Sequence, residues 1–373
     1  MLACEPAATK GEPGSQQLQG GRIALNACTA ARLGGAGAVR HDRSTALDDP
    51  LIAPAPGRES DVWSRWLLRQ RHADDPAFAA IVRADVGRIA DRVLDAAQLA
   101  PGMRLADIGA GEGVLAFRAL ERIGPSLSVL LTDISASMLH HAAALAVERG
   151  VRAQCSFLHC AADKLSGVAA ASVDVVATRA VLAYVADKPA ALREFHRILK
   201  PGGRISIAEP ILQDDALMAS ALRSLIESKD AQSQDRFLPL LHRWKAAQFP
   251  DSPEAILGSP IANYSERNLF DFARTAGFSD IHLELHIDMQ PSIIRSWEVF
   301  LNYSPHPWAP PLGAVLAEQF TPEERELFEQ TARPVVESPD AIAITRLAYL
   351  NAVKPLRRPV GRHPDSATLA TDR

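Results

Sequence analysis

The sequence is poor in cysteine and has no long uncharged apolar segment. Only 4 of its 373 residues are cysteines, and their irregular spacing predicts free thiols rather than a disulfide framework. No apolar run reaches the ~18–20 residues that a membrane-spanning helix needs. These absences argue against a disulfide-rich secreted protein and against a protein with a membrane span.

The chain also lacks an excess of positive charge. Its 40 Lys and Arg residues against 44 Asp and Glu residues give a formal net charge of −4. This balance counts against a nucleic acid as partner, although it does not exclude a local basic groove.

The histidines and cysteines show no motif at metal-ligand spacing, so no metal site is expected. The first residues lack the pattern of a secretory signal, which predicts a cytoplasmic protein.

Composition and periodicity divide the chain into segments. Residues 1–55 are rich in Gly, Ala and Pro without periodicity, which predicts a disordered tail. Beyond it we expect a helical cover over 56–100, a core over 101–288 with a helical insertion at 212–260, a second insertion over 289–340, a last strand over 341–354 and a mobile tail over 355–373. Strand patterns alternate with helix patterns inside the core, which is typical of parallel βαβ units in a doubly wound sheet.

A glycine-rich turn in LADIGAGEGVLA, residues 105–116, is expected to bind a ligand. An apolar strand ends near Asp107, and the chain then enters a helix through Gly109, Ala110, Gly111 and Gly113. Glycine permits positive φ and close approach of a ligand, and the helix N-terminus offers free N–H groups to a carboxylate. Dinucleotide-binding oxidoreductases use a similar turn, but Val114 stands where G-x-G-x-x-G requires its last glycine.

Asp133 ends the next apolar strand, where an acidic side chain can accept hydrogen bonds from both hydroxyls of a ribose. Together, the segments ADIGAGEG, LLTDIS, SVDVVATRAVLAYVAD and FHRILKPGGRISIAEPI resemble successive motifs of the class I S-adenosylmethionine (SAM)-dependent methyltransferases. They resemble especially the small-molecule branch that includes the ubiquinone and menaquinone C-methyltransferases. The resemblance is strong over residues 101–212 and weaker over 264–288. It implies a Rossmann-like, seven-stranded, mostly parallel sheet, helical insertions that form a substrate cover, and SAM as cofactor.

The resemblance also implies roles for individual residues. Asp107 and the Gly109–Gly113 loop would face the methionine part of SAM, and Asp133 would bind its ribose. Ile134 and Met138 would flank the adenine. In the next loop, family members often have Gly-Asp-Ala-Glu, whereas this chain reads Cys-Ala-Ala-Asp over residues 160–163. Either Asp163 or the backbone of Ala162 must therefore replace the acid that usually faces the adenine.

Arg179 and Glu209 are the candidate catalytic residues, because each ends a strand at the sheet edge where ligands bind in open α/β folds. Arg179 is expected to contact the SAM carboxylate or an anionic substrate, with a structural ion pair as the alternative. Glu209 is predicted to act as a general base, to cap a neighbouring segment or to pair with Arg179. Since the two strands should be neighbours, we expect both side chains to meet at the rim.

Two aromatic segments outside the core are candidates for a cover. Trp63 and Trp66 precede the core domain, and Trp308 lies in the proline-rich segment NYSPHPWAPP. Each segment is interpreted as aromatic core, as a lid over the active site, or as both.

The sequence therefore predicts methyl transfer from SAM to a carbon, oxygen or nitrogen of a small molecule, with secondary metabolism as one setting. The runner-up is an RNA or protein methyltransferase, which the net charge and the lack of an appended basic domain disfavour. The same pattern is also compatible with a dinucleotide-dependent oxidoreductase, a SAM-fold enzyme with non-methyl chemistry or a binding-only protein. Substrate, accepting atom and oligomeric state are not defined by the sequence.

Overall fold

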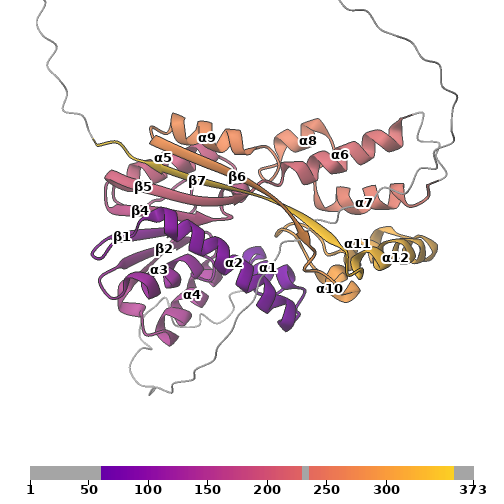
Figure 1. Cartoon of the computed structure of the whole chain (residues 1–373), viewed down its shortest axis with the longest axis horizontal. Helices are drawn as coiled ribbons and strands as arrows, with labels where there is room; N and C mark the ends of the chain where they lie inside the picture. Colours follow the sequence, from indigo (N-terminus) through magenta and orange to yellow (C-terminus); the bar gives the residue numbers. More distant parts are fainter. Residues whose placement is uncertain (1–59, 229–234, 357–373) are drawn as a thin grey trace, which may run out of the picture.

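The computed structural model describes residues 60–228 and 235–356 (Figure 1). The tail expected at 1–55 and residues 357–373 lie outside the described residues. Helices surround a sheet of seven strands in the order β3-β2-β1-β4-β5-β7-β6. Strands β1 to β5 pair in parallel, whereas β7 pairs antiparallel with both β5 and β6. The expected Rossmann-like, mostly parallel sheet is thereby confirmed.

The strands follow the apolar runs of the sequence. Their bounds are β1 (Arg104–Ile108), β2 (Ser128–Asp133), β3 (Cys155–His159), β4 (Val173–Arg179), β5 (Leu199–Pro210), β6 (Ser279–Pro291) and β7 (Ile342–Val353). Strands β1, β2 and β4 are buried over nearly their whole length. This is expected of central parallel strands, since helices cover both faces of the sheet.

Helices α2 (Pro76–Ala97), α3 (Val114–Ile123) and α4 (Ala136–Glu148) cover one face of the sheet. Val93 of α2, Leu120 of α3 and Leu139 of α4 lie in one hydrophobic core. They pack there with Leu105 and Val175 of the sheet. Local sequence sets the helix starts: for example, Asp75 accepts a hydrogen bond from Phe78 N (2.7 Å) and Pro76 follows as the first helical residue.

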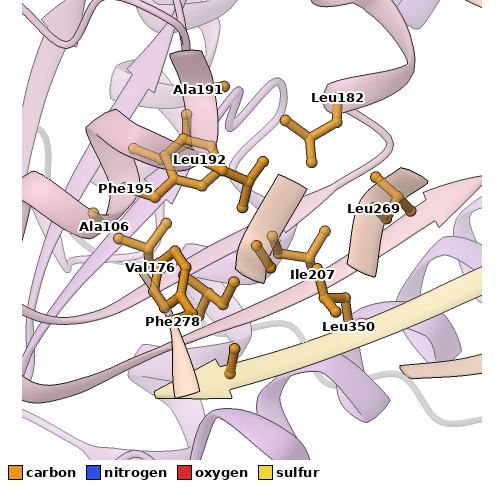
Figure 2. Packing of buried hydrophobic residues seen from close by; sticks show 14 of the residues in the cluster. Ala106, Val176, Leu182, Ala191, Leu192, Phe195, Ile207, Leu269, Phe278 and Leu350 are labelled. Carbon is orange, nitrogen blue, oxygen red and sulfur yellow. The ribbon is translucent and has the colours of Figure 1, made fainter. Parts of the chain in front are cut away.

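Helices α5 (Lys188–Ile198) and α9 (Glu266–Thr275) cover the opposite face. Phe195 and Leu269 from these helices and Phe278 enter a second core with Val176 and Ile207 of the sheet (Figure 2). The two cores lie on opposite sides of the sheet, so the carboxyl ends of β1, β2, β4 and β5 remain at one shared edge.

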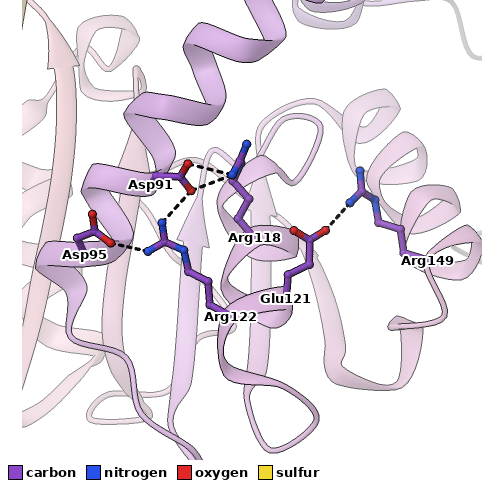
Figure 3. A network of polar contacts seen from close by, with 6 residues as sticks. All are labelled: Asp91, Asp95, Arg118, Glu121, Arg122 and Arg149. Atoms are coloured by element: carbon purple, nitrogen blue, oxygen red, sulfur yellow. Dashed lines mark hydrogen bonds and ion pairs between the residues drawn. The ribbon is translucent and has the colours of Figure 1, made fainter. Parts of the chain in front are cut away.

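Ion pairs tie together the outer surfaces of α2, α3 and α4 (Figure 3). Arg122 of α3 donates to Asp91 (2.8 Å) and Asp95 (2.7 Å) of α2, and Arg149 donates to Glu121 (3.0 Å). These side chains are about one-third exposed or more, so solvent screening makes each pair worth roughly 0–1 kcal/mol. The buried cores therefore contribute more than this network to the stability of the fold.

Helices lie before the sheet and between its last strands. Before the sheet are α1 (Val62–Leu68) and the 3-10 turn η1 (Gln70–His72), and η2 (Arg152–Gln154) precedes β3. Between β5 and α9 lie α6 (Gln213–Glu227), α7 (Leu238–Gln248) and α8 (Pro253–Gly258). Between β6 and β7 lie α10 (Trp297–Asn302), α11 (Leu312–Gln319) and α12 (Pro322–Val336). No helix within 60–228 and 235–356 is long and apolar enough to cross a bilayer.

Helices α7, α10, α11 and α12 form a third core beside the extended ends of β6 and β7 (Figure 1). Phe328 of α12 is fully buried and contacts Trp244 of α7 with ring centroids 5.9 Å apart. Trp244 also contacts Phe300 of α10 at 5.3 Å. This third core is therefore assembled from segments on both sides of α9 and β6 in the sequence.

Strand β6 departs from its predicted burial. The alternating pattern predicts one apolar face over Ile281–Ile287, but Leu285 and Ile287 are 36% and 59% exposed. The reason is that β6 continues to Pro291, beyond the core that covers Ile281 and Leu283. The opposite face, with His286 and Gln290, instead lines an internal cavity.

Replacing Phe328 by Ala should lower the free energy of unfolding by about 3–5 kcal/mol, because the ring is fully buried in the third core. Denaturant unfolding followed by circular dichroism measures this change. The matched control is Leu257→Ala on α8, where the side chain is 74% exposed and a change below ~0.5 kcal/mol is expected. If the free energy of unfolding fell no more in Phe328→Ala than in Leu257→Ala, the third core would not contribute to cooperative stability.

Candidate active site

The glycine-rich loop between β1 and α3 has a backbone that side chains would obstruct. Gly109, Gly111 and Gly113 adopt φ values of +66°, +54° and +76°. A Cβ added at Gly109 would lie 2.5 Å from Cγ2 of Val181, and one at Gly113 would lie 2.6 Å from the Phe117 ring. The spacing of the glycines is therefore required both by positive φ and by close packing.

Two buried carboxylates flank this loop. Asp107 at the end of β1 is 2% exposed and accepts a hydrogen bond from Ala116 N (3.1 Å), and burial raises the pKa of its carboxyl to about 7. Asp133 at the end of β2 is 8% exposed, and burial also raises its pKa. Its Oδ2 accepts from Gly111 N and its Oδ1 from Ser135 N, both at 2.8 Å. Each oxygen keeps a lone pair for a further donor.

A cavity of about 410 Å³ collects most of the predicted cofactor residues. It is lined by Asp107, Gly109, Ala110, Gly111, Asp133, Ile134, Ala162, Asp163 and Arg179. Two predicted residues do not line it. Gly113 instead caps the start of α3, and the Met138 side chain is fully buried away from the cavity. Met138 lies inside α4, where helical spacing turns it toward the core.

Fourteen further residues line this cavity; four lie ahead of the core, and ten lie within the motif segments or the loop over residues 160–163 without a predicted cofactor role. They are Trp63, Trp66, Leu67, Arg71, Glu112, Val114, Leu115, Cys160, Ala161, Ala180, Val181, Tyr184, Val185 and Ala186. Of the four residues ahead of the core, only the tryptophans gave a signal in the sequence, as aromatic residues of a possible cover. Arg71 lies in η1, and no local pattern connects that turn to the glycine-rich loop.

The N-terminal helix covers the cofactor cavity. Asp61 caps α1 by accepting from Ser64 N (2.8 Å) and also accepts from the Ser135 hydroxyl (2.6 Å) ahead of α4. Trp63 contacts Tyr184 and Trp308, with ring centroids 5.2 Å and 5.5 Å apart. The two aromatic segments singled out in the sequence therefore meet, although more than half of the chain separates them.

A larger cavity of about 600 Å³ adjoins the first. It lies among α2, the ends of β5, β6 and β7, and the third core. Both cavities are lined by the same five residues, which are Trp66, Arg71, Arg179, Ala180 and Tyr184. A molecule in one cavity is therefore adjacent to a molecule in the other.

Two guanidinium groups belong to this shared wall. Arg71 pairs with Glu112 at 3.3 Å, and its Nε is buried without a hydrogen-bond partner. Burial, together with the nearby charge of Arg179, lowers the pKa of Arg71. Within the described ranges, Arg179 makes no ion pair. The wall thus carries positive charge that an anionic group of a ligand would balance.

Glu209 does not join Arg179 at this wall. Strands β4 and β5 pair with Arg179 opposite Ala208, so Glu209 points to the other face of the sheet. Its carboxylate is fully buried, lines neither cavity and has a pKa raised by burial. This register contradicts the expected meeting of the two side chains and leaves a general base at Glu209 without access to a substrate.

The Glu209 carboxylate instead holds the loop after β4. It accepts hydrogen bonds from Val181 N (3.0 Å), Ala183 N (3.1 Å) and the Thr178 hydroxyl (3.3 Å). This loop contains Ala180, whose φ is +55°, and the 3-10 turn η3 (Leu182–Tyr184). Of the three roles predicted for Glu209, the structure supports a cap on a neighbouring segment.

No metal centre is apparent in the part of the chain that the structure describes. Within it, no group of three or more His, Cys, Asp or Glu side chains is arranged to hold a metal ion.

Replacing Glu209 by Gln should lower the free energy of unfolding by about 1–3 kcal/mol. The amide nitrogen cannot accept a hydrogen bond, so at least one buried donor of the loop loses its partner. Chemical denaturation tests this, with Glu227→Gln on the exposed end of α6 as the matched control. Unchanged stability with a large loss of turnover would contradict the structural role and restore the general base.

Comparison with known proteins identifies the same family as the sequence motifs. A family model described as a methyltransferase domain matches residues 99–245. The chain is 32% identical over 206 residues to nocamycin O-methyltransferase of Saccharothrix syringae, a match that covers 54% of this chain and 68% of that relative.

Two shorter matches concern the same family. One is the tRNA 5-carboxymethoxyuridine methyltransferase of Escherichia coli K12, 37% identical over 118 residues, with 31% of this chain and 43% of that protein covered. Another is a ubiquinone/menaquinone biosynthesis C-methyltransferase of Xanthomonas campestris, 38% identical over 113 residues, with 30% and 44% covered. The chain thus spans less than half the length of these two relatives. Together with the match to the nocamycin enzyme, they show that this chain belongs to the class I SAM-dependent methyltransferases.

Proposed function

We propose that this enzyme transfers the methyl group of SAM to a small-molecule acceptor held in the larger cavity. When bound, SAM supplies a methyl group activated by its sulfonium. The observation that carries the proposal is the wall common to both cavities, since it brings an acceptor next to the cofactor. Holding two reactants in this way can supply up to about 7–11 kcal/mol of the acceleration.

The smaller cavity fits SAM on the evidence of its own residues. The side-chain-free surface of Gly109 and Gly111 lets a ligand approach the backbone, and Asp107 lies beside it for the methionine part. Asp133 keeps lone pairs for two ribose hydroxyls while it holds the Gly111 amide. Ile134, Ala162 and Asp163 would surround the adenine.

Arg71 and Arg179 would hold the anionic parts of the reactants. Both line both cavities, so they can bind the carboxylate of SAM on one side and orient an acceptor on the other. Trp63, Trp66 and Tyr184 would exclude water from the reacting groups. With Glu209 buried elsewhere, the proposal relies on positioning and assigns no general base.

The larger cavity favours a small molecule over a polymer. Its volume of about 600 Å³ lies within the ~300–1,000 Å³ of typical small-molecule sites. Phe78, Phe249, Phe300 and Leu312 give it apolar walls beneath the helical layer. The net charge of −4 likewise offers no general attraction to RNA. A setting in the cytoplasm and in secondary metabolism belongs to the same proposal.

Incubation of the enzyme with methyl-labelled SAM and metabolite extracts, followed by mass spectrometry, tests the function. We expect the label in a low-molecular-mass product, and roughly 10- to 100-fold slower labelling when Asp133→Ala replaces the enzyme at limiting SAM. Label in tRNA or protein would contradict the small-molecule acceptor. SAM binding without any labelled product would favour non-methyl chemistry or a binding role.

Replacing Asp133 by Ala should weaken SAM binding by about 1.5–3 kcal/mol, because a charged acceptor for two ribose hydroxyls is lost. Calorimetric titration measures the affinity, and a thermal melt without ligand separates this effect from loosening of the Gly111 loop. Asp133→Asn keeps one acceptor oxygen and should lose less. Equal affinity in wild type and Asp133→Ala would disprove the ribose assignment.

A further inference from the structure

Helix α7 contributes two adjacent polar side chains to the larger cavity. Trp244 is 5% exposed and Lys245 is 7% exposed, and both line the cavity. The Lys245 Nζ lies 4.5 Å from the centroid of the Trp244 ring. The buried indole Nε1 of Trp244 has no hydrogen-bond partner. The Lys245 ammonium therefore lies over the Trp244 ring in this wall, whereas the indole N–H is enclosed by the protein.

The Lys245 ammonium has no direct counter-ion within the described ranges. Burial lowers the pKa of Lys245, and the charge of Asp215 on α6 only partly opposes this effect. Apart from Arg179, other cations that line the cavity form ion pairs; for example, Arg88 pairs with Asp85 and Arg346 pairs with Asp214. Burying an unpaired charge is costly, so an anionic ligand beside Lys245 would be stabilised.

We propose that the acceptor carries an anionic group, such as a carboxylate, that binds Lys245 beside Trp244 in the larger cavity. This inference rests on the proposed function of that cavity. Neither residue belongs to the wall shared with the cofactor cavity, so the anion is an anchor and not the methylated group. The apolar walls hold the remainder of the acceptor. The substrate class is thus an apolar molecule with an acidic anchor.

Two fluorescent probes of nearly equal shape separate charge from size. Anilinonaphthalene sulfonate is anionic, whereas phenylnaphthylamine has the same aromatic body without charge. The full-length enzyme should bind the sulfonate more tightly than the neutral probe. Lys245→Met, which keeps the length of the side chain, should weaken sulfonate binding by about 10- to 100-fold and leave the neutral probe unchanged.

Three further variants make the result specific. Lys245→Arg keeps the charge and should retain the preference for the sulfonate. Trp244→Phe keeps an aromatic ring beside the ammonium and should also retain this preference. The matched control is Lys200→Met, which removes an ammonium that pairs with Asp174 outside the cavity, and it should change neither probe. Equal sulfonate binding by wild type and Lys245→Met, or no binding of either probe, overturns the proposal.

The acceptor itself gives an independent test. Lys245→Met should leave SAM affinity unchanged and raise the KM for the acceptor that labelling identifies, with a smaller effect on kcat. An acceptor without an anionic group would overturn the anchor while the methyl transfer function stands. Absence of methyl transfer with intact sulfonate selectivity would instead leave an anion site in a protein of different function.

Discussion

Glu209 accepts hydrogen bonds from Val181 and Ala183 and so holds the loop after β4 in one conformation. The loop carries Ala180 and Tyr184, which together with Arg179 line both cavities. Val181 in turn packs against Gly109, so the same loop also limits the glycine-rich turn. A buried carboxylate on the far face of the sheet thereby fixes the position of the wall across which the methyl group would pass.

The two cavities are built by different means. The cofactor cavity depends on the carboxyl ends of β1, β2 and β4, where backbone groups and short side chains lie at fixed positions in the sheet. The larger cavity depends on α2, on the extensions of β6 and β7, and on the helices of the third core. Packing of large aromatic rings such as Trp244 and Phe300 sets its walls. In the proposed function, a cofactor site built on the sheet is therefore combined with an acceptor site that the helical segments shape.

The two cavities also differ in how the protein compensates their buried charged groups. Around the cofactor cavity, buried carboxylates accept hydrogen bonds from backbone N–H groups, and these bonds stabilise the ionised form against burial. In the larger cavity, the charge of Asp215 and the Trp244 ring near the Lys245 ammonium compensate for its burial only in part. This difference is consistent with the proposed function. The fold compensates the buried charges around the cofactor cavity, whereas an anionic ligand would compensate the charge of Lys245 in the larger cavity.

The sequence by itself determined the strands, the glycine-rich turn and the position of Asp133, because each depends on a short stretch of chain. Strand β1 ends beside Asp107 as predicted, and positive φ at Gly109 and Gly111 follows from local backbone geometry. Only the tertiary structure decided the orientation of Glu209, the burial of Met138 and the exposure of Ile287. Register with β4 turned Glu209 away from Arg179, packing of α4 buried Met138, and the length of β6 exposed Ile287. These outcomes depend on which segments become neighbours, and no local pattern of residues records that.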